Sequence, residues 1–355
     1  MNPTLKAPAA ASGRGAAFLT GGSLLFASRE EKALGRALDD GLVAVEKGLE
    51  RELTFSDEIT DAVSRHLFDA GGKRVRPLLA LLTSQWGSGI NDRVLIAAQV
   101  TELTHLATLY HDDVMDDAVQ RRGVAATQTV WGNSVAILAG DLLFARAGSL
   151  GGSLGQQAIT LQAATFERLV VGQMQETLGP KPGDEPIAHY LQVLSDKTGS
   201  LIALAAEMGI RMADGPEALI PAVRAFGEKI GIAFQLVDDV IDLSDRSAGT
   251  GKPPGTDVRH GVTTLPVLYL REAAKVDPAA KELVATLARG ATGELSEDEF
   301  QKAITELRHH EVTEATMQTA RDMADQAIAY LDDAPSGIVK EGLVRFAHHV
   351  VDRSY

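Results

Sequence analysis

Apolar residues recur with helical spacing along almost the whole chain, and this periodicity constrains the fold more than any other feature. From residue 30 to residue 351, stretches with apolar side chains three and four residues apart follow one another. No stretch alternates like a half-buried strand or carries the signals of a hairpin. The breaks at 179–185 and 244–261 are too short to be clear interdomain linkers. We therefore expect an all-α fold, a single-domain helical bundle over residues 29–355.

Several of the expected helices begin after residues that commonly cap helices. Ser56 precedes one helix and Asn91 precedes another. The expected helices are Glu30–Leu53, Asp57–Ala70, Pro77–Trp86, Asp92–Asp113, Gln128–Leu150, Leu154–Leu178, Pro186–Met212, Glu217–Leu243, Thr264–Ala274, Ala279–Arg289, Ser296–Leu307, Thr313–Asp333 and Ile338–Val351.

Composition excludes several classes of protein. Hydrophobic residues make up 45% of the 355 residues, enough for a sizeable core. The formal net charge of −14 argues against nucleic acid or an anionic membrane surface as the main partner. The chain has no cysteine, so disulfides and thiolate metal sites are excluded, and a cytoplasmic location is the simplest interpretation.

The N-terminal segment 1–28 is expected to be a flexible leader. Its apolar part, Ala16–Ala27, resembles a signal-peptide core, but Gly21 and Gly22 interrupt it, so secretion is the less favoured alternative. Nowhere does an uninterrupted apolar run reach the ~18 residues of a membrane span.

Two segments carry nearly the same acidic motif, Asp-Asp-Val-x-Asp, at 112–116 and 238–242. Each lies in an apolar, helix-patterned stretch, where its first and last acids share one face. Like charges packed this closely repel unless a cation lies between them. Magnesium takes a few carboxylate oxygens and fills its remaining positions with phosphate oxygens, so the two motifs indicate two walls of one Mg²⁺ site.

A polar stripe precedes the first motif on the same helix. Thr101, Thr104, His105 and Thr108 lie on or near the face of Asp112. Such a stripe amid apolar faces suits the lining of an internal cavity. An exposed polar face is the alternative, and His105 taken alone would be an ordinary structural histidine.

Basic residues form two further motifs. Gly71–Pro77 places Lys73, Arg74 and Arg76 at the start of an apolar helix, where backbone N–H groups and the helix dipole favour anions. Arg121 and Arg122 follow the first acidic motif, and arginine forks suit bidentate binding of phosphate. Each motif alone is weak, because surface charge is common; together with the acids they indicate a second, metal-free anion site.

The second acidic helix has a similar organisation. Gln235, Asp238, Asp239 and Asp242 share one face, and a Gly/Pro-rich loop that contains Lys252 follows. Lys197 and Thr198 lie in an otherwise apolar helix, where a solvated lysine is the alternative interpretation. These residues indicate a substrate whose diphosphate ionises as a leaving group.

Taken together, the motifs resemble those of the trans-isoprenyl diphosphate (polyprenyl) synthases, from about residue 60 to the C-terminus. The resemblance implies an isoprenoid-synthase helical bundle around a central cavity, usually a homodimer. It also implies prenyl transfer from an allylic diphosphate to isopentenyl diphosphate, by ionisation, condensation and proton loss. We expect the hydrocarbon product to pass to a membrane.

The resemblance also implies roles for individual residues. The catalytic residues would be Asp112, Asp113, Asp116, Asp238, Asp239 and Lys197. The direct metal ligands would be Asp112, Asp116, Asp238 and Asp242. The allylic diphosphate would bind Arg121, Lys197, Thr198, Gln235 and Lys252. Isopentenyl diphosphate would bind Lys73, Arg76, His105 and Arg122.

Two positions bear on specificity. Val262 stands where many relatives have a lysine, which removes one expected diphosphate contact for which Arg259 or His260 is the candidate substitute. Ala107 and Thr108 lie where shorter-chain relatives place aromatic rings as a floor to the tail pocket. The resemblance therefore implies products of C20 or longer.

Three alternatives were weighed. A class I terpene cyclase normally has a different second motif and no second basic site. A non-catalytic regulatory subunit tends to lose its acidic motifs, whereas both are complete here. Calcium storage is disfavoured because the acids lack the spacing of a calcium loop.

Overall fold

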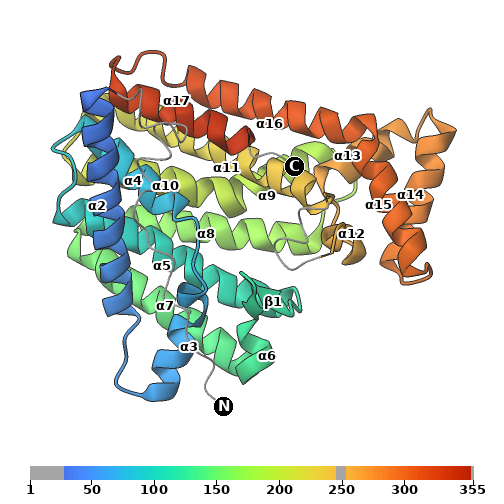
Figure 1. The fold of residues 1–355 in the computed structure, drawn as a ribbon, viewed down its shortest axis with the longest axis horizontal. Coiled ribbons are helices and arrows are strands. Elements are labelled where there is room, and N and C mark those ends of the chain that lie inside the picture. Colours follow the sequence, from blue (N-terminus) through green and yellow to red (C-terminus); the bar gives the residue numbers. More distant parts are fainter. Residues whose placement is uncertain (1–27, 245–252, 353–355) are drawn as a thin grey trace. The chain divides into compact units, whose positions relative to one another are not determined.

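The structure is a computed structural model that describes residues 28–244 and 253–352 (Figure 1). Within these residues the elements are helices, apart from one short two-stranded hairpin, so the all-α expectation is confirmed. By contacts, the described chain divides into two compact units. Unit 1 comprises 28–166, 201–224 and 333–346, and unit 2 comprises 167–200, 225–332 and 347–352.

Several helices contribute residues to both units. The elements that begin in unit 1 are α2 (Arg29–Glu52), α3 (Glu58–Asp69), α4 (Val75–Thr83), a 3₁₀ turn (Ser84–Trp86), α5 (Asp92–Met115), β1 (Gln120–Arg121), β2 (Val124–Ala125), α6 (Thr127–Trp131), α7 (Asn133–Ser153), α8 (Gln156–Leu178), a 3₁₀ turn (Glu217–Leu219), α11 (Ile220–Asp242) and α17 (Ile338–Val351). Those that begin in unit 2 are α9 (Pro186–Leu194), a π-helical turn (Ser195–Gly199), α10 (Ser200–Met212), α12 (Thr256–Arg259), α13 (Leu265–Ala273), α14 (Pro278–Ala291), α15 (Glu297–His309) and α16 (Glu311–Ala329).

Helix α5 is the central helix of unit 1. It packs against α2, α4 and α7, and its buried positions lie on all sides. A helix that is buried on all sides needs packing elements around it, and α5 has them although it carries a polar stripe. Asn91 caps it, because its side chain accepts a hydrogen bond from the N–H of Val94. This cap confirms the expected helix start.

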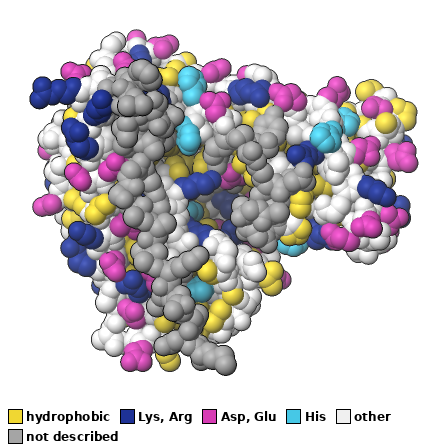
Figure 2. Space-filling view, viewed as in Figure 1, with side chains coloured by type: hydrophobic (Ala, Val, Ile, Leu, Met, Phe, Trp, Pro, Cys, Tyr) yellow, Lys and Arg dark blue, Asp and Glu magenta, His cyan; other side chains and the backbone are white. Residues whose placement is uncertain are grey.

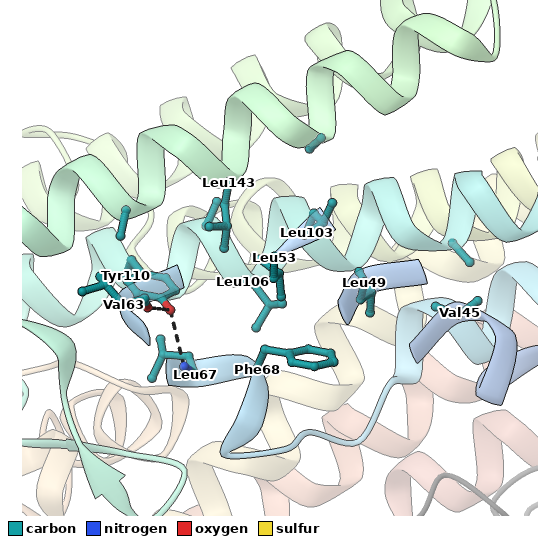
Figure 3. Close-up of a cluster of buried hydrophobic side chains, with 14 of the residues drawn as sticks. Val45, Leu49, Leu53, Val63, Leu67, Phe68, Leu103, Leu106, Tyr110 and Leu143 are labelled. Carbon is teal, nitrogen blue, oxygen red and sulfur yellow. Dashed lines mark hydrogen bonds between the residues drawn. The ribbon is translucent and has the colours of Figure 1, made fainter. Parts of the chain in front are cut away.

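The core of unit 1 fixes the end of α5 that carries the first acidic motif (Figure 3). Tyr110 is fully buried, and its hydroxyl donates a hydrogen bond to the Val63 carbonyl (2.7 Å) and accepts one from the Leu67 N–H (3.4 Å). Both partners belong to α3. Leu106 and Leu143 belong to the same cluster. The last turn of α5 is therefore anchored two residues before Asp112.

Unit 2 buries one face of α11. Leu236, Val237 and Val240 belong to a core cluster with Leu268 of α13 and Met317 of α16. The acids at 238 and 242 lie on the opposite side of the helix from these apolar positions, so burial of the apolar face sets which way they point. A second cluster joins α13, α14 and α15, which lie side by side in Figure 1.

Three expected helices differ from the structure. Gly132, with φ of 84°, separates α6 from α7 inside the expected helix 128–150. The expected helix 186–212 is interrupted by the π-helical turn at 195–199. Asp57, not Ser56, caps α3, since its carboxylate accepts from the Thr60 N–H. In the first two cases the apolar spacing survives while a local backbone feature breaks the helix, and in the third only the capping residue differs.

The short hairpin was not predicted from the sequence. Gln120 pairs with Ala125 and Arg121 with Val124, and the two loop residues Arg122 and Gly123 have φ of 53° and 77°. Positive φ at both loop positions is the type I′ geometry of tight hairpins. The strands are too short for an alternating pattern, so glycine after the arginine pair was the available signal.

One helix passes a length-and-composition test for crossing a membrane. Helix α7 has 21 residues and a most apolar window of mean hydropathy 1.3, of which 33% is buried. A single such helix is weak support for a span, since core helices of other proteins pass the same test.

The expected leader lies outside the described residues apart from Ser28, which caps α2. The expected single-domain organisation stays a prediction.

Candidate active site

The first acidic motif occupies the last turn and the C-cap of α5. Asp113 is fully buried, Asp112 is half-buried and Asp116 is exposed. Arg121 reaches the Asp113 carboxylate with Nε at 2.6 Å and Nη2 at 2.5 Å. The middle acid of the motif is therefore held in an ion pair within the protein, while the two outer acids share a different face of the helix.

The hairpin sends its two arginines to different partners. Arg121 pairs with Asp113, whereas Arg122 donates from Nη1 to the carbonyls of Leu67 (2.9 Å) and Gly71. Gln128 steadies the loop by donating to the carbonyls of Asp113 and Ala118. Arg121 therefore binds the acidic motif, and Arg122 binds backbone carbonyls of the segment that leads into α4.

Two guanidinium groups converge on the glycines before α4. A Cβ at Gly72 would lie 2.6 Å from Arg74 Nη1 and 3.1 Å from Arg122 Nη2, so only glycine fits without displacing them. Arg74 is itself buried and pairs with Glu46 (2.6 Å) and Glu102 (3.1 Å). Arg74 was predicted only as one of the cations of this motif, and its two ion pairs, which make it the anchor of this segment, were not predicted.

His105 and Arg76 complete the basic cluster. Burial lowers the pKa of His105 well below 6.5, and Arg76 and Arg122 lower it further, with smaller effects from Arg121 and Arg74. The imidazole is therefore neutral at pH 7. Burial and the charge of Arg122 lower the pKa of Arg76 to about 10, against the opposing effect of Glu102. The Nε of Arg76 is buried and makes no hydrogen bond, which leaves a donor for an anion.

The second acidic motif lies at the end of α11. Asp239 is buried, and the hydroxyl of Tyr190 on α9 donates a hydrogen bond to it at 2.6 Å. Burial raises the pKa of Asp239 well above its usual value, and Asp257 and Asp238 add to the rise, while the bond from Tyr190 opposes it. Sequence analysis did not single out Tyr190.

The loop after α11 is tied back to the motif. Asp242 accepts hydrogen bonds from the N–H of Asp257 at its carboxylate (3.1 Å) and from the N–H of Gly255 at its carbonyl (2.8 Å). The half-buried Gln235 lies two turns before Asp242. Lys252, the expected lysine of this loop, lies outside the described residues.

The π-helical turn carries Lys197 and Thr198. The ammonium of Lys197 pairs with Glu176 on α8 at 2.5 Å, and Thr198 is buried. A Cβ at Gly172 would lie 2.8 Å from the backbone nitrogen of Lys197, and a Cβ at Gly231 would lie 2.5 Å from the Cα of Gly199. The turn is therefore packed tightly between α8 and α11. Lys197 is ion-paired with Glu176, not simply solvated as the alternative interpretation had it.

Arg259, one candidate to replace the diphosphate contact missing at Val262, already binds other residues. Val262 is exposed. Arg259 donates from Nη2 to both carboxylate oxygens of Glu297, at 2.7 and 2.8 Å, and its guanidinium carbon lies 4.2 Å from the centre of the Phe300 ring. His260 is exposed and is the less occupied candidate.

The polar stripe of α5 is buried, so the alternative of an exposed polar face is wrong. Thr101, Thr104 and Thr108 are at most 8% exposed, and each hydroxyl donates to a carbonyl three or four residues earlier on its own helix. With their hydroxyls satisfied, these threonines are left to pack through their methyl groups. Ala107 is fully buried in the core cluster that includes Leu143.

Metal-binding potential lies in the outer acids of each motif. Among the described residues, no three His, Asp or Glu side chains already gather as a metal-binding group. A phosphate-bridged magnesium ion needs only one or two carboxylates from the protein, and the i, i+4 pairs at 112/116 and 238/242 meet that requirement. On the face shown in Figure 2, basic side chains are interspersed with acidic ones.

Comparison with known proteins identifies the family. The model of the polyprenyl synthetase family matches residues 57–307. A nonaprenyl diphosphate synthase of Mycobacterium tuberculosis is 41% identical over 316 residues, 87% of this chain and 92% of the relative.

Solved structures agree. A polyprenyl synthase from Caulobacter crescentus, complexed with calcium and isoprenyl diphosphate, superposes with a TM-score of 0.81 at 31% identity, over 90% of this chain and 96% of that one. A geranylgeranyl pyrophosphate synthase from Corynebacterium glutamicum, with the same ligands, gives 0.78 at 40% identity, over 93% and 99%. This chain belongs to the polyprenyl synthetase family and has its all-α isoprenoid synthase fold.

Proposed function

We propose that this prenyltransferase condenses isopentenyl diphosphate with an allylic diphosphate in a magnesium-dependent reaction and releases a trans-polyprenyl diphosphate of C20 or longer. The observation that carries the proposal is that both acidic motifs are complete at the ends of α5 and α11, while a separate cluster of arginines stands at the start of α4. Two diphosphates need two such sites.

Magnesium fits the outer acids. Asp112 and Asp116 on one helix, and Asp238 and Asp242 on the other, would hold it, while Asp113 and Asp239 keep their protein partners Arg121 and Tyr190. When bound, magnesium neutralises the charge of the departing diphosphate. The relatives crystallised with calcium and isoprenyl diphosphate support a divalent cation in this role.

Basic and polar side chains are the proposed contacts of the allylic diphosphate. Arg121 supplies a guanidinium beside the first motif, and Lys197 an ammonium on the π-helical turn. Lys197 would exchange Glu176 for the diphosphate, since a doubly charged anion competes well for an ammonium group. The remaining proposed contacts are Thr198, Gln235 and Lys252.

Isopentenyl diphosphate would bind in the basic cluster of unit 1. Arg76 and Arg122 supply guanidinium groups, His105 supplies a neutral N–H donor, and the exposed Lys73 adds a fourth contact. Burial and the charge of Arg122 lower the pKa of Arg76, and burial with the charges of Arg74 and Arg121 lowers the pKa of Arg122. A bound anion would relieve this repulsion between the guanidinium groups. This arrangement favours binding without a metal.

The reaction needs no nucleophilic side chain. The allylic carbon–oxygen bond breaks, and its electron pair leaves with the diphosphate. The double bond of isopentenyl diphosphate then attacks the allylic cation. Loss of one proton, which the departed diphosphate accepts, forms the new double bond. The protein's part is to hold both diphosphates and to stabilise the charge that develops on the leaving one.

We further propose that the enzyme acts as a homodimer in the cytoplasm. Helix α7 leaves Ile137 and Leu138 42% and 65% exposed, although the helix is largely apolar. Contiguous exposed apolar surface usually marks an interface, and a second copy would cover this one. The absence of cysteine fits a reducing compartment.

Product length of C20 or more rests on Ala107 and Thr108. Neither offers an aromatic floor to a growing tail. Because Ala107 is packed in the core, a phenylalanine there would also overpack it, whereas Thr108 keeps 8% exposure. Thr108→Phe is therefore the cleaner variant, and it should shorten the product.

The test is incubation of the purified protein with labelled isopentenyl diphosphate, magnesium and allylic primers of different lengths, followed by chromatography of the products. Elongation that stops when magnesium is chelated is the expected result. Failure to elongate any primer would overturn the proposal, and molar-mass determination in solution tests the dimer separately.

A further inference from the structure

A partly buried ion-pair network contacts the π-helical turn and includes none of the residues assigned to substrate or metal. Its centre is Arg168 of α8. The guanidinium of Arg168 donates from Nε to Asp196 Oδ1 (2.7 Å), from Nη2 to Ser195 Oγ (3.2 Å), and from Nη1 and Nη2 to the two carboxylate oxygens of Glu228 (3.2 Å each). One side chain thus joins α8, the π-helical turn and α11 within unit 2.

The partners of Arg168 are fixed among themselves. Ser195 Oγ donates to Glu228 Oε1 at 2.6 Å, and Gln192 donates to the second oxygen of Asp196 at 2.7 Å. Ser200 Oγ donates to the backbone carbonyl of Asp196 at 2.6 Å. Ser195 and Asp196 are both buried, at 6% and 8% exposure. The network therefore grips the residues immediately before Lys197, on both side chain and backbone.

A π-helical turn needs such support. It contains one residue more than the α-helical path, and its wider hydrogen-bond ring is intrinsically less favourable than the α-helical one. In a regular α-helix each residue advances by about 100°, so relaxation of the turn by one residue would rotate Lys197 and Thr198 away from their present direction.

We propose that Arg168 is a positioning residue, which holds the π-helical turn so that Lys197 and Thr198 face the allylic diphosphate. The inference rests on the proposed function, since it takes Lys197 and Thr198 as contacts of that substrate. Arg168 acts through the turn, and touches neither substrate nor metal. A methionine at this position keeps most of the volume but loses all four donated hydrogen bonds.

The experiment compares steady-state kinetics of wild type, Arg168→Met and Lys197→Ala, with each substrate varied in turn. We expect Arg168→Met to lower kcat/KM for the allylic diphosphate about tenfold or more, because small misplacements of a binding group are costly, while KM for isopentenyl diphosphate stays within about twofold. Arg168→Lys keeps the charge but not the fork of donors. Its kcat/KM for the allylic diphosphate should lie between those of wild type and Arg168→Met.

A double-mutant cycle separates positioning from a merely structural role. If Arg168 acts through Lys197, the double variant should be little worse than Lys197→Ala alone. Additive losses, or equal losses for both substrates, would overturn the proposal. So would an unchanged kcat/KM for the allylic diphosphate in Lys197→Ala.

Arg211→Met is the matched control. Arg211 on α10 pairs with Glu207 at 2.8 Å, and is likewise a partly buried arginine–carboxylate pair, but it does not contact the turn. It should leave the kinetics for both substrates unchanged, and a loss confined to the allylic substrate in this control would count against Arg168. If Arg168→Met does not fold, Ser195→Ala removes one bond of the network and should shift the same parameter in the same direction by a smaller factor, with no shift overturning the proposal.

A wild-type enzyme that elongates no primer would refute the proposed function itself. An active wild type, with Arg168→Met indistinguishable from it, would refute only the positioning role.

Discussion

The two acidic motifs have almost the same sequence, yet the protein surrounds them differently. In unit 1 the middle acid, Asp113, pairs with the guanidinium of Arg121. In unit 2 the middle acid, Asp239, accepts a hydrogen bond from the hydroxyl of Tyr190, and burial, together with other acids, raises its pKa. One motif is electrostatically compensated by the chain itself, and the other stands in an acid-rich environment.

The difference teaches that a motif specifies the outer acids more firmly than the inner one. The first and last acids must face the same way on a helix, whatever surrounds them. The middle acid points into the protein, where a neighbouring element decides its charge and its partner. Variants at the outer and the inner acids can show how far the two motifs are equivalent.

If the outer acids of both motifs hold the metal, removal of either should be about equally damaging. Asp112→Ala and Asp238→Ala should each lower turnover roughly 100- to 1,000-fold, the usual scale for loss of one electrostatic contact to a developing charge. Steady-state assays at saturating magnesium measure this, with circular dichroism to check folding. Asp325→Ala, at an exposed position of α16, is the control. If a variant keeps its turnover within tenfold of wild type, the motif that it alters does not hold the metal.

The inner acids should differ in stability. Arg121→Met leaves the fully buried Asp113 carboxylate without its ion pair and should lower the free energy of unfolding by about 3 kcal/mol. Tyr190→Phe removes one hydrogen bond and should cost about 1 kcal/mol. Urea denaturation measures both. Asp113→Asn should recover part of the loss in the Arg121→Met background, and equal costs for the two single variants would show that the environments are equivalent after all.

Glycines beside the two sites should also behave differently. A Cβ at Gly231 meets the backbone of Gly199, which cannot give way, so Gly231→Ala should destabilise by about 1–3 kcal/mol. A Cβ at Gly72 meets only the ends of Arg74 and Arg122, so Gly72→Ala should chiefly raise KM for isopentenyl diphosphate. Thermal unfolding and kinetics separate the two effects. Gly148→Ala, where no atom lies within 4 Å, should be neutral or slightly stabilising.

The basic cluster should produce a pH dependence of stability. The pKa of His105 in the folded protein lies well below its unfolded value of 6.5, so as pH falls the unfolded chain takes up the proton first. The free energy of unfolding should therefore drop by about 1.4 kcal/mol per pH unit below pH 6.5, until pH passes the folded pKa. The difference between wild type and His105→Gln isolates this slope, and parallel profiles would show that His105 is not held neutral.

Much of the fold was readable because helical periodicity is local. Side-chain spacing predicted the buried end of α5 and the acid face of α11, and residue type predicted the Asn91 cap. The hairpin at 120–125 and the π-helical turn at 195–199 were not readable, because each is short and defined by backbone geometry rather than by an apolar pattern. Tyr190, Arg74 and Arg168 were missed for a related reason, since their partners lie far away in the sequence.

By itself, the sequence determined that the chain is helical, that two carboxylate pairs share helix faces, and that cations cluster before α4. These properties depend only on residue type and on a spacing of three or four positions. The tertiary structure decided which acid pairs with Arg121, which with Tyr190, and that a ring of hydrogen bonds holds Lys197 on a π-helical turn. Such choices depend on which elements meet in space, because burial and neighbouring charge fix the state of a side chain only once the chain has folded.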